Sequence, residues 1–336
     1  MASELQPLGV GVIGLGVGLA HVATFNSVPG VEVRSVCDLD IDLCMKAKSL
    51  VPDARVVSEW RHVVTSTDVD IVVVATPDAL HAEMIKYALS HSKHVFAEKP
   101  ICLSAGELSL VVQALRDNPN SHFSANMVLR ANPIFIQLRS DLAAGSMGLV
   151  SHMEMSYLYG RFNKILLGWR GQPPRYSAFL GGGIHMVDLA LWLVGERPVS
   201  VIGVGQSIAS EGLGRQIDDL EIAILKFQNG LTATISAVMA SSVPHSHVVT
   251  IHGTKKSFMM GPLGCGYLNS DPTSASQDVA VPLGYDRRSI ATSFVDEIIG
   301  RRPALVPAAD VLDCTAVALA VRESIATGVE TPVKYP

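Results

Sequence analysis

The sequence has few cysteines and no long apolar run, and both shortages narrow the kinds of protein that it can encode. Five cysteines occur among 336 residues. They are widely spaced and form no CxxC pair, which is typical of reduced thiols rather than a disulfide scaffold. No apolar stretch has the length of a membrane-spanning helix. The apolar run 8–20 is interrupted by glycines and follows Glu4 with no preceding lysine or arginine, unlike a signal peptide. We therefore expect a cytoplasmic protein.

Concentrated positive charge is also missing. Lysine and arginine number 26 against 31 aspartates and glutamates, for a net charge of −5, and the basic residues are scattered. This distribution argues against nucleic acid or an anionic membrane as the main partner and favours a small molecule. His81 and Glu83 have no third ligand at a suitable spacing, so no metal site is predicted.

The first third of the chain alternates short apolar strands with helices. Strands are predicted at 10–13, 31–36, 71–75, 94–97 and 123–125, and helices at 19–26, 41–50, 79–90 and 103–117. The β-branched run 71–75 is typical of a strand that is buried on both faces of a parallel sheet. Repeated β-α units predict an α/β Rossmann domain with a doubly wound parallel sheet, which we assign to residues 1–125.

The pattern changes after residue 125. A helix predicted at 133–144 precedes strand-like runs at 150–159, 199–208, 221–227, 231–238 and 248–252, and helices follow at 290–299 and 309–326. We predict that residues 126–336 form an α+β domain with a large, mostly antiparallel open sheet and helices on one face. The stretch 263–282, rich in Gly, Ser and Pro, is predicted to be loop. A sheet face that these helices leave uncovered favours a homodimer or homotetramer.

A glycine-rich turn follows the first predicted strand. The turn comprises Gly14, Leu15, Gly16, Val17 and Gly18. Here the backbone must bend and let a pyrophosphate approach the helix N-terminus. A literal GxGxxG match at 9–14 falls inside the strand and is out of register. The third glycine of the fingerprint is replaced by Leu19, so a glycine-rich turn without a ligand stays an alternative.

An acidic residue ends the second predicted strand. Asp38 stands 24 residues after Gly14, where a carboxylate can accept hydrogen bonds from the adenosine ribose and repel a 2′-phosphate. Asp40 is expected to cap the helix at 41–50. We therefore predict NAD rather than NADP as the cofactor.

Three further stretches carry chemistry-bearing residues. They are Ala-Thr-Pro-Asp-Ala-Leu-His at 75–81, Lys-His-Val-Phe-Ala-Glu-Lys-Pro at 93–100 and Gly-Gly-Gly-Ile-His-Met-Val-Asp at 181–188. With the glycine-rich turn, they closely resemble the glucose–fructose oxidoreductase/inositol dehydrogenase (Gfo/Idh/MocA) family. Phe-Gln-Asn-Gly at 227–230 and His-Gly-Thr at 252–254 extend the resemblance to nearly the whole chain. Glu-Lys-Pro after a buried strand is its most specific element.

The resemblance implies roles for the matched residues. Thr76, Pro77 and His81 would line the cofactor groove, and Glu98 would lie there as a positioning group for Lys99. Lys99 would touch both the nicotinamide ribose and the substrate hydroxyl. The resemblance also implies that His185 faces Lys99 across the cleft. The residues assigned to substrate binding are Arg130, Trp169, Arg170 and Asp188.

The chemistry of alcohol oxidation agrees with these roles. Removing a hydride requires a base for the hydroxyl proton and positive charge beside the developing alkoxide, while the cofactor takes the hydride. Lys99 and His185 are therefore the predicted catalytic residues. A solvated surface lysine, a structural histidine and an Asp188 that caps a helix or forms an ion pair are the alternatives.

The predicted function is hydride transfer between NAD and a secondary alcohol or ketone of a sugar, cyclitol or glycoside. Two alternatives stay open: a redox-neutral epimerase or glycoside-cleaving enzyme with tightly bound NAD, and a non-catalytic protein that binds NAD or a sugar. Many family members carry an acidic residue four positions before the histidine, where this chain has Gly181. A Lys–Asp–His arrangement is therefore not assumed, and the three glycines are expected to admit a bulky substrate.

Overall fold

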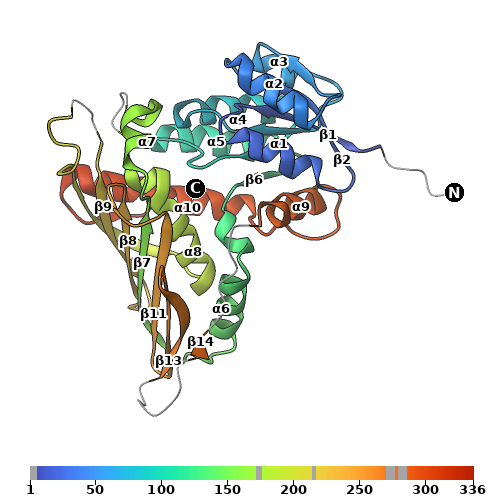
Figure 1. Ribbon diagram of the computed structural model, residues 1–336. Coiled ribbons are helices and arrows are strands. Elements are labelled where there is room, and N and C mark those ends of the chain that lie inside the picture. Colours follow the sequence, from blue (N-terminus) through green and yellow to red (C-terminus); the bar gives the residue numbers. More distant parts are fainter. Residues whose placement is uncertain (1–5, 172–175, 214–216, 270–276, 279–285) are drawn as a thin grey trace. The chain divides into compact units, whose positions relative to one another are not determined.

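The computed structural model describes residues 6–171, 176–213, 217–269, 277–278 and 286–336 (Figure 1). The chain divides into two compact units. The first comprises Met1–Ala131 with Asp286–Leu312, and the second comprises Asn132–Tyr285 with Asp313–Pro336. This division differs from the two continuous segments expected from the sequence, because residues 286–312 return to the first unit.

The first unit contains a six-stranded sheet in the order β3-β2-β1-β4-β5-β6, and every neighbouring pair is parallel. The strands are β1 (Leu8–Ile13), β2 (Val31–Cys37), β3 (Arg55–Val57), β4 (Ile71–Val74), β5 (His94–Ala97) and β6 (Phe123–Ala125). Every residue of β4 is buried, as its β-branched run predicts. The strand order reverses between β1 and β4, and this confirms the predicted doubly wound sheet. Such reversals are where open α/β sheets bind ligands.

The described helices of the first unit are α1 (Gly18–Asn26), α2 (Ile41–Leu50), α3 (Trp60–Val64), α4 (His81–Ser90), α5 (Ala105–Asp117) and α9 (Arg287–Ile298). Four of these six, α2, α3, α5 and α9, begin after a residue whose side chain accepts from a free backbone N–H, whereas α1 and α4 have no such cap. Asp40 caps α2 by accepting from the N–H groups of Asp42 and Leu43, which confirms its predicted role. The short helix α3 was not predicted, and residues 78–80 form a 3-10 turn before α4.

Residues 286–312 complete the core of the first unit. The ring of Phe294 on α9 lies 5.7 Å from that of Phe96 on β5. The hydroxyl of Ser124 donates to the carbonyl of Val306 over 2.9 Å. A strand from the start of the chain and a segment from its end therefore share one interior.

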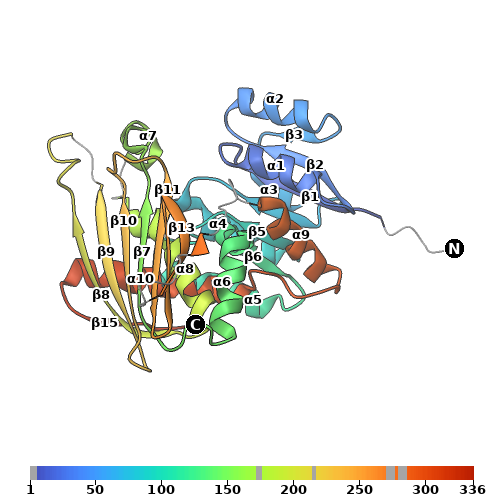
Figure 2. The same ribbon diagram turned by 60° about the horizontal axis from the view of Figure 1, so that its bottom comes forward.

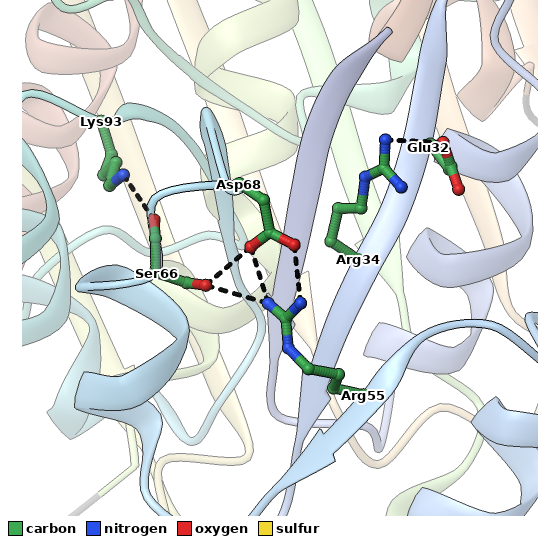
Figure 3. Close-up of polar contacts among 6 residues, drawn as sticks. All are labelled: Glu32, Arg34, Arg55, Ser66, Asp68 and Lys93. Atoms are coloured by element: carbon green, nitrogen blue, oxygen red, sulfur yellow. Dashed lines mark hydrogen bonds and ion pairs between the residues drawn. The ribbon is translucent and has the colours of Figure 1, made fainter.

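Exposed ion pairs lie near the amino ends of these parallel strands. Figure 3 shows Glu32, Arg34, Arg55, Ser66, Asp68 and Lys93. The guanidinium of Arg55 holds both oxygens of Asp68, at 2.6 and 2.7 Å, and Lys93 donates to the carbonyl of Ser66 at 2.9 Å. Parallel sheets bind ligands at the opposite, carboxyl ends of their strands. This cluster therefore serves stability rather than the site.

The second unit contains a nine-stranded sheet in the order β14-β13-β12-β11-β7-β10-β9-β8-β15. The strands are β7 (Val150–Leu158), β8 (Pro198–Gln206), β9 (Leu220–Phe227), β10 (Thr232–Val238), β11 (Ser246–Gly253), β12 (Lys256–Gly261), β13 (Gly264–Asn269), β14 (Gln277–Asp278) and β15 (Thr331–Pro332). Among the described strands only the β7–β10 pair is parallel. This confirms the predicted, mostly antiparallel sheet.

One face of this sheet is buried beneath helices. A continuous buried row crosses five strands at Gly203, Ala223, Ile235, Met155 and Val249. Helix α8 (Ile184–Val194) packs against β7 and β10, and the end of α10 (Ala308–Thr327) packs on β8 (Figure 2). A Cβ on Gly203 would lie 2.7 Å from the Ile325 side chain, so glycine permits this close approach. Helices α6 (Pro133–Ala143) and α7 (Phe162–Leu167) complete the unit.

The predicted loop at 263–282 is wrong for residues 264–269, which form β13 and pair with β12, and for residues 277–278, which form β14 and pair with β13. Residues 270–276 and 279–282 lie outside the described residues. The ring of Tyr267 packs against Phe258 at 5.3 Å, and its hydroxyl donates to Asp141 on α6. Packing against neighbours therefore overrides the weak strand propensity of a glycine-rich sequence. In the described part of the chain, no helix is long and apolar enough to cross a membrane.

Candidate active site

The glycine-rich turn in the first unit has the geometry that a bound diphosphate requires. Gly14 has a φ of +83°, and a Cβ there would lie 2.6 Å from the main chain of Ala75. A Cβ on Gly16 would meet no atom within 4 Å, so space is open beside the turn. Val17, at the N-cap of α1, supplies no capping side chain, and the first turn has no acidic residue. The uncapped N–H groups and positive end of the helix dipole suit an anionic group.

Asp38 holds the same turn from the end of β2. One carboxylate oxygen accepts from the N–H of Leu15 at 2.5 Å, and the other accepts from the N–H of Asp40 at 2.8 Å. Each oxygen keeps a second lone pair, so a ribose hydroxyl can still donate to it. The contact of Asp38 with ribose stays a prediction. Its hydrogen bond to the glycine-rich turn is a second role, which the sequence did not indicate.

Glu98 is a buried carboxylate with three hydrogen-bond partners, and its role in positioning Lys99 stays a prediction. Its Oε1 accepts from Nε2 of His21 and from Nδ2 of Asn126, both at 2.8 Å, and its Oε2 accepts from the backbone N–H of Lys99 at 3.3 Å. Burial raises the pKa of Glu98, but the hydrogen bond and charge of His21, the charge of Lys99 and the Asn126 bond together hold the pKa well below its usual range. Glu98 is therefore a fixed anion and not a proton donor.

His21 and Asn126 were missed by the sequence analysis. They come from α1 and from the residue after β6, more than 100 positions apart in the chain. The polar character of two residues at otherwise buried positions was the only available signal, and it gives no indication of a common partner. Only the parallel sheet brings both to Glu98.

His81 connects two loops at the carboxyl edge of the sheet. Its Nδ1 lies 2.7 Å from the carbonyl of Pro100, and its Nε2 lies 2.7 Å from the carbonyl of Thr76. Because carbonyls only accept, the ring nitrogen that carries the hydrogen is the donor in each such bond. The ring is fully buried. His81 therefore holds the Thr76–Pro77 loop beside the Lys99–Pro100 segment, and its part in a cofactor groove stays a prediction.

The carboxyl ends of four neighbouring strands thus gather most of the predicted cofactor residues at one edge. These residues are Gly14, Leu15, Gly16, Val17, Gly18, Asp38, Thr76, Pro77, Glu98 and Lys99. Arg130 differs from them, because its guanidinium is 2% exposed and donates to Asp310 at 2.5 Å and to the carbonyl of Leu305 at 3.2 Å. These contacts tie residues 128–131 to the returning segment 286–312. A role for Arg130 in substrate binding stays a prediction.

In the second unit, His185 lies in the first turn of α8 beside a group of aromatic rings. It is 9% exposed, and its ring stacks on that of Tyr157 at 6.1 Å with an interplanar angle of 25°. On its other sides, Tyr157 contacts the rings of His245 at 5.1 Å and His247 at 5.4 Å. Burial, with the nearby charge of His245, lowers the pKa of His247 to about 3. His247 is therefore neutral near pH 7.

Three glycines before His185 leave room for rings of the chain itself. They form a π-helical turn, Phe179–Gly183. A Cβ on Gly181 would lie 1.6 Å from the hydroxyl oxygen of Tyr176, and one on Gly182 would lie 2.4 Å from Cε1 of Tyr157. The expectation that these glycines admit a bulky substrate is therefore wrong at these two positions, because two tyrosines fill the space.

Glu221 on β9 anchors the start of this turn. Its Oε2 accepts from the hydroxyl of Ser177 at 2.8 Å and from the backbone N–H of Phe179. Burial raises its pKa to about 7, although the bonds from Phe179 and Ser177 oppose that rise. No signal in the sequence marks Glu221 as buried, since an acidic residue in a strand is usually exposed.

The remaining predicted substrate residues fall in two places. The guanidinium of Arg170 lies 4.3 Å from the ring centre of Trp169 and 5.8 Å from that of Tyr176, and Trp169 is 42% exposed. Asp188 is 1% exposed on α8, nearly one turn after His185. Among the described residues no three His, Cys, Asp or Glu side chains converge on a possible metal position.

Comparison with known proteins agrees with both units. The family model described as "Oxidoreductase family, NAD-binding Rossmann fold" matches residues 8–125. The model of the GFO/IDH/MocA C-terminal domain matches residues 135–259. The chain belongs to the Gfo/Idh/MocA family. Membership confirms the predicted resemblance, the oxidoreductase class and NAD as the cofactor.

The individual relatives and the solved structure described next are at most 28% identical to this chain. The 2,7-anhydro-N-acetylneuraminate hydratase of Escherichia coli is 28% identical over 74% of this chain and 66% of its own. Inositol 2-dehydrogenase 2 of Saccharopolyspora erythraea is 26% identical over 68% of this chain and 66% of its own. A structure of levoglucosan dehydrogenase in complex with NADH and levoglucosan has a TM-score of 0.86 at 22% identity, covering 98% of this chain and 100% of its own. That last likeness bears on the fold alone.

Proposed function

We propose that this family member transfers a hydride between NAD and a secondary alcohol or ketone of a sugar, cyclitol or glycoside. The observation that carries the proposal is the fixed Glu98 carboxylate, which holds the main chain of Lys99 at the same sheet edge as the open Gly16 turn. Relatives named as inositol 2-dehydrogenase 2 and levoglucosan dehydrogenase, each 26% identical to this chain, support this substrate class.

Each residue in the proposal has a defined task. The cofactor, when bound, supplies the hydride chemistry. In one form of the proposal Lys99 is an ammonium that stabilises the alkoxide developing on the substrate oxygen, and His185 accepts the hydroxyl proton. In the other form Lys99 is a neutral amine that accepts this proton and becomes the stabilising ammonium. Glu98, held by His21, keeps Lys99 in place. Arg130, Trp169, Arg170 and Asp188 are the proposed substrate-binding residues, of which Trp169 offers a partly exposed aromatic face.

The test is a panel of polyols, aldoses and glycosides mixed with NAD and followed by the absorbance of NADH. We expect oxidation of at least one member. Lys99→Ala and His185→Ala should each lower turnover by at least about a hundredfold, because general acid–base and charge-stabilising groups contribute on that scale. Affinity for NADH, measured by fluorescence titration, should stay within about threefold.

A second candidate is a redox-neutral reaction with tightly bound NAD, and the relative named as a hydratase favours it. Products should therefore be analysed by mass spectrometry with and without added NAD. A product of unchanged oxidation state would select this candidate. Sugar binding without any product would instead select the non-catalytic alternative, and both results would refute net oxidation.

The uncovered face of the second sheet supports our proposal of a homodimer or homotetramer. Strands β8, β9, β12 and β13 each expose an apolar side chain, namely Val204, Ile224, Met259 and Leu268. Exposed apolar side chains on one sheet favour association. Light scattering at micromolar concentration tests this, and a monomer would contradict it. We also propose a cytoplasmic location, since all five cysteines are buried and none forms a disulfide.

A further inference from the structure

The hydroxyl of Tyr176 occupies the place that a side chain on residue 181 would need. An ideal Cβ on Gly181 would lie 1.6 Å from Oη of Tyr176 and 2.3 Å from its Cζ. Gly181 is buried and stands about one helical turn before His185, whereas Tyr176 is partly exposed. The phenol therefore delivers a polar group, from five residues away, to the stretch that carries His185.

Several contacts hold Tyr176 in this place. Its main chain forms a β-bridge with Ile217, and its carbonyl accepts from the N–H of Asp218 at 3.4 Å. The next residue, Ser177, donates to the buried Glu221. The main chain that carries the Tyr176 ring is thus held both at residue 176 itself and at the next residue.

The ring of Tyr176 also adjoins residues that we assign to substrate. Trp169 meets it edge-on, with ring centres 6.5 Å apart and an interplanar angle of 89°. The Arg170 guanidinium lies 5.8 Å from the ring centre. An aromatic face, a cation and a phenol hydroxyl are thereby brought together within one unit, and this combination suits a polyhydroxylated ligand, which offers both C–H faces and hydroxyl groups.

We propose that Tyr176 is a catalytic residue whose hydroxyl hydrogen-bonds the oxygen of the reacting carbinol. The inference rests on the proposed function. In the oxidation, the carbinol C–H bond breaks and its electron pair goes with the hydrogen to the nicotinamide of NAD, while the hydroxyl proton goes to the general base. Tyr176 keeps its own proton and donates a hydrogen bond to the oxygen as negative charge develops there. Gly181 is required because any side chain would displace this hydroxyl.

The first test is Tyr176→Phe, which removes only the hydroxyl. With the best substrate of the wild-type panel, kcat/KM should fall about a hundredfold, the usual scale for one lost donor to a developing oxyanion. The affinity for NADH should be unchanged. The kinetic isotope effect with deuterium on the carbinol carbon should rise, because hydride transfer becomes slower relative to the other steps. The matched control is Tyr335→Phe, whose lost hydroxyl donates to the Pro198 carbonyl at 2.7 Å.

The second test moves a hydroxyl to residue 181. In a Tyr176→Ala background, the phenol no longer blocks the Cβ position of residue 181. Gly181→Ser then places a new hydroxyl one bond beyond that Cβ, in the space that the phenol had filled. This double variant should recover at least about tenfold of the lost kcat/KM. Gly181→Ala in the same background supplies the same Cβ without oxygen and should recover nothing. In the wild-type background, Gly181→Ala should itself impair the enzyme, since its Cβ collides with the phenol.

Distinct results overturn distinct claims. A Tyr176→Phe enzyme with kcat/KM within twofold of wild type would overturn the role of Tyr176 and leave the proposed function standing. The same role fails if activity falls but the isotope effect stays constant and serine at residue 181 restores no more than alanine, because both results describe a structural residue. A wild-type enzyme that oxidises no panel member would overturn the proposed function and this inference with it.

Discussion

The buried carboxyl of Glu221 should make the stability of the second unit depend on pH in a direction unusual for an acidic residue. Burial raises its pKa from the ordinary 4.5 to about 7. Between these values the folded chain holds a proton that the unfolded chain has released. Stability therefore falls as pH rises through this window, since the folded state binds more protons there.

The size of the effect follows from the two pKa values. A tenfold difference in proton affinity corresponds to about 1.4 kcal/mol, so the gap from 4.5 to about 7 corresponds to about 3 kcal/mol. Glu221→Gln removes the titration. Both hydrogen bonds to Glu221, from Ser177 and Phe179, reach the same oxygen, so the amide oxygen of glutamine can accept both. The variant should lie within about 1 kcal/mol of wild type at pH 5 and exceed it by up to about 3 kcal/mol at pH 8.

Urea unfolding followed by tryptophan fluorescence measures this difference. The chain has three tryptophans, and Trp60→Phe leaves Trp169 and Trp192, both in the second unit. Midpoints should be recorded from pH 5 to 8 for this background with and without Glu221→Gln. Glu154→Gln on β7 is the matched control, since Glu154 is 61% exposed and should change little. If the profiles with and without Glu221→Gln run parallel, Glu221 does not titrate in this window and the reasoning is refuted.

Three further outcomes are expected. Asp38→Ala should lower the ratio of kcat/KM for NAD over NADP, because it removes the carboxylate that would repel a 2′-phosphate; an unchanged ratio would contradict the role. Gly14→Ala should cost more than about 1–3 kcal/mol in thermal unfolding, since φ is +83° and the Cβ would collide with the Ala75 main chain; a wild-type melting curve would refute this. Arg55→Ala should cost at most about 1 kcal/mol, because its pair with Asp68 is about half exposed. The Arg55 bond lowers the pKa of Asp68, so this small contribution is present above about pH 4 and is lost as pH falls further; a cost that survives at pH 2 or in 1 M salt would contradict it.

The Rossmann unit was predictable because each of its elements carries a local signal. The fully buried β4 shows a β-branched run, and α2 begins after the capping residue Asp40. The return of residues 286–312 had no such signal. The helix at 287–298 is amphipathic, and its sequence predicts a helix without indicating which of the two sheets it covers. Long-range packing, such as that of Phe294 on Phe96, decides its place.

In the candidate site, too, the residues in local motifs were predictable and the partners brought close by long-range packing were not. The Gly14 turn, Asp38 and Glu98-Lys99 stand in recognisable motifs at strand ends, and the sequence placed them at one edge. The partners that fix Glu98 were hidden, because His21 and Asn126 are isolated polar residues in apolar surroundings. Tyr176 could not be predicted for a different reason. Its hydroxyl fills the space that a Cβ on Gly181 would need, and the sequence does not show that these two residues are in contact.

The return of residues 286–312 governs the order in which the protein can fold while it is being made. Domains usually fold as they leave the ribosome, at about 5–20 residues per second. The nucleotide-binding sheet leaves first, but Phe294 and Val306, which complete its interior, follow only after residues 132–285. That interval lasts roughly 10–30 s at these rates, during which one side of Phe96 lies uncovered. The first part of the chain to be synthesised is thus among the last to reach its final packing.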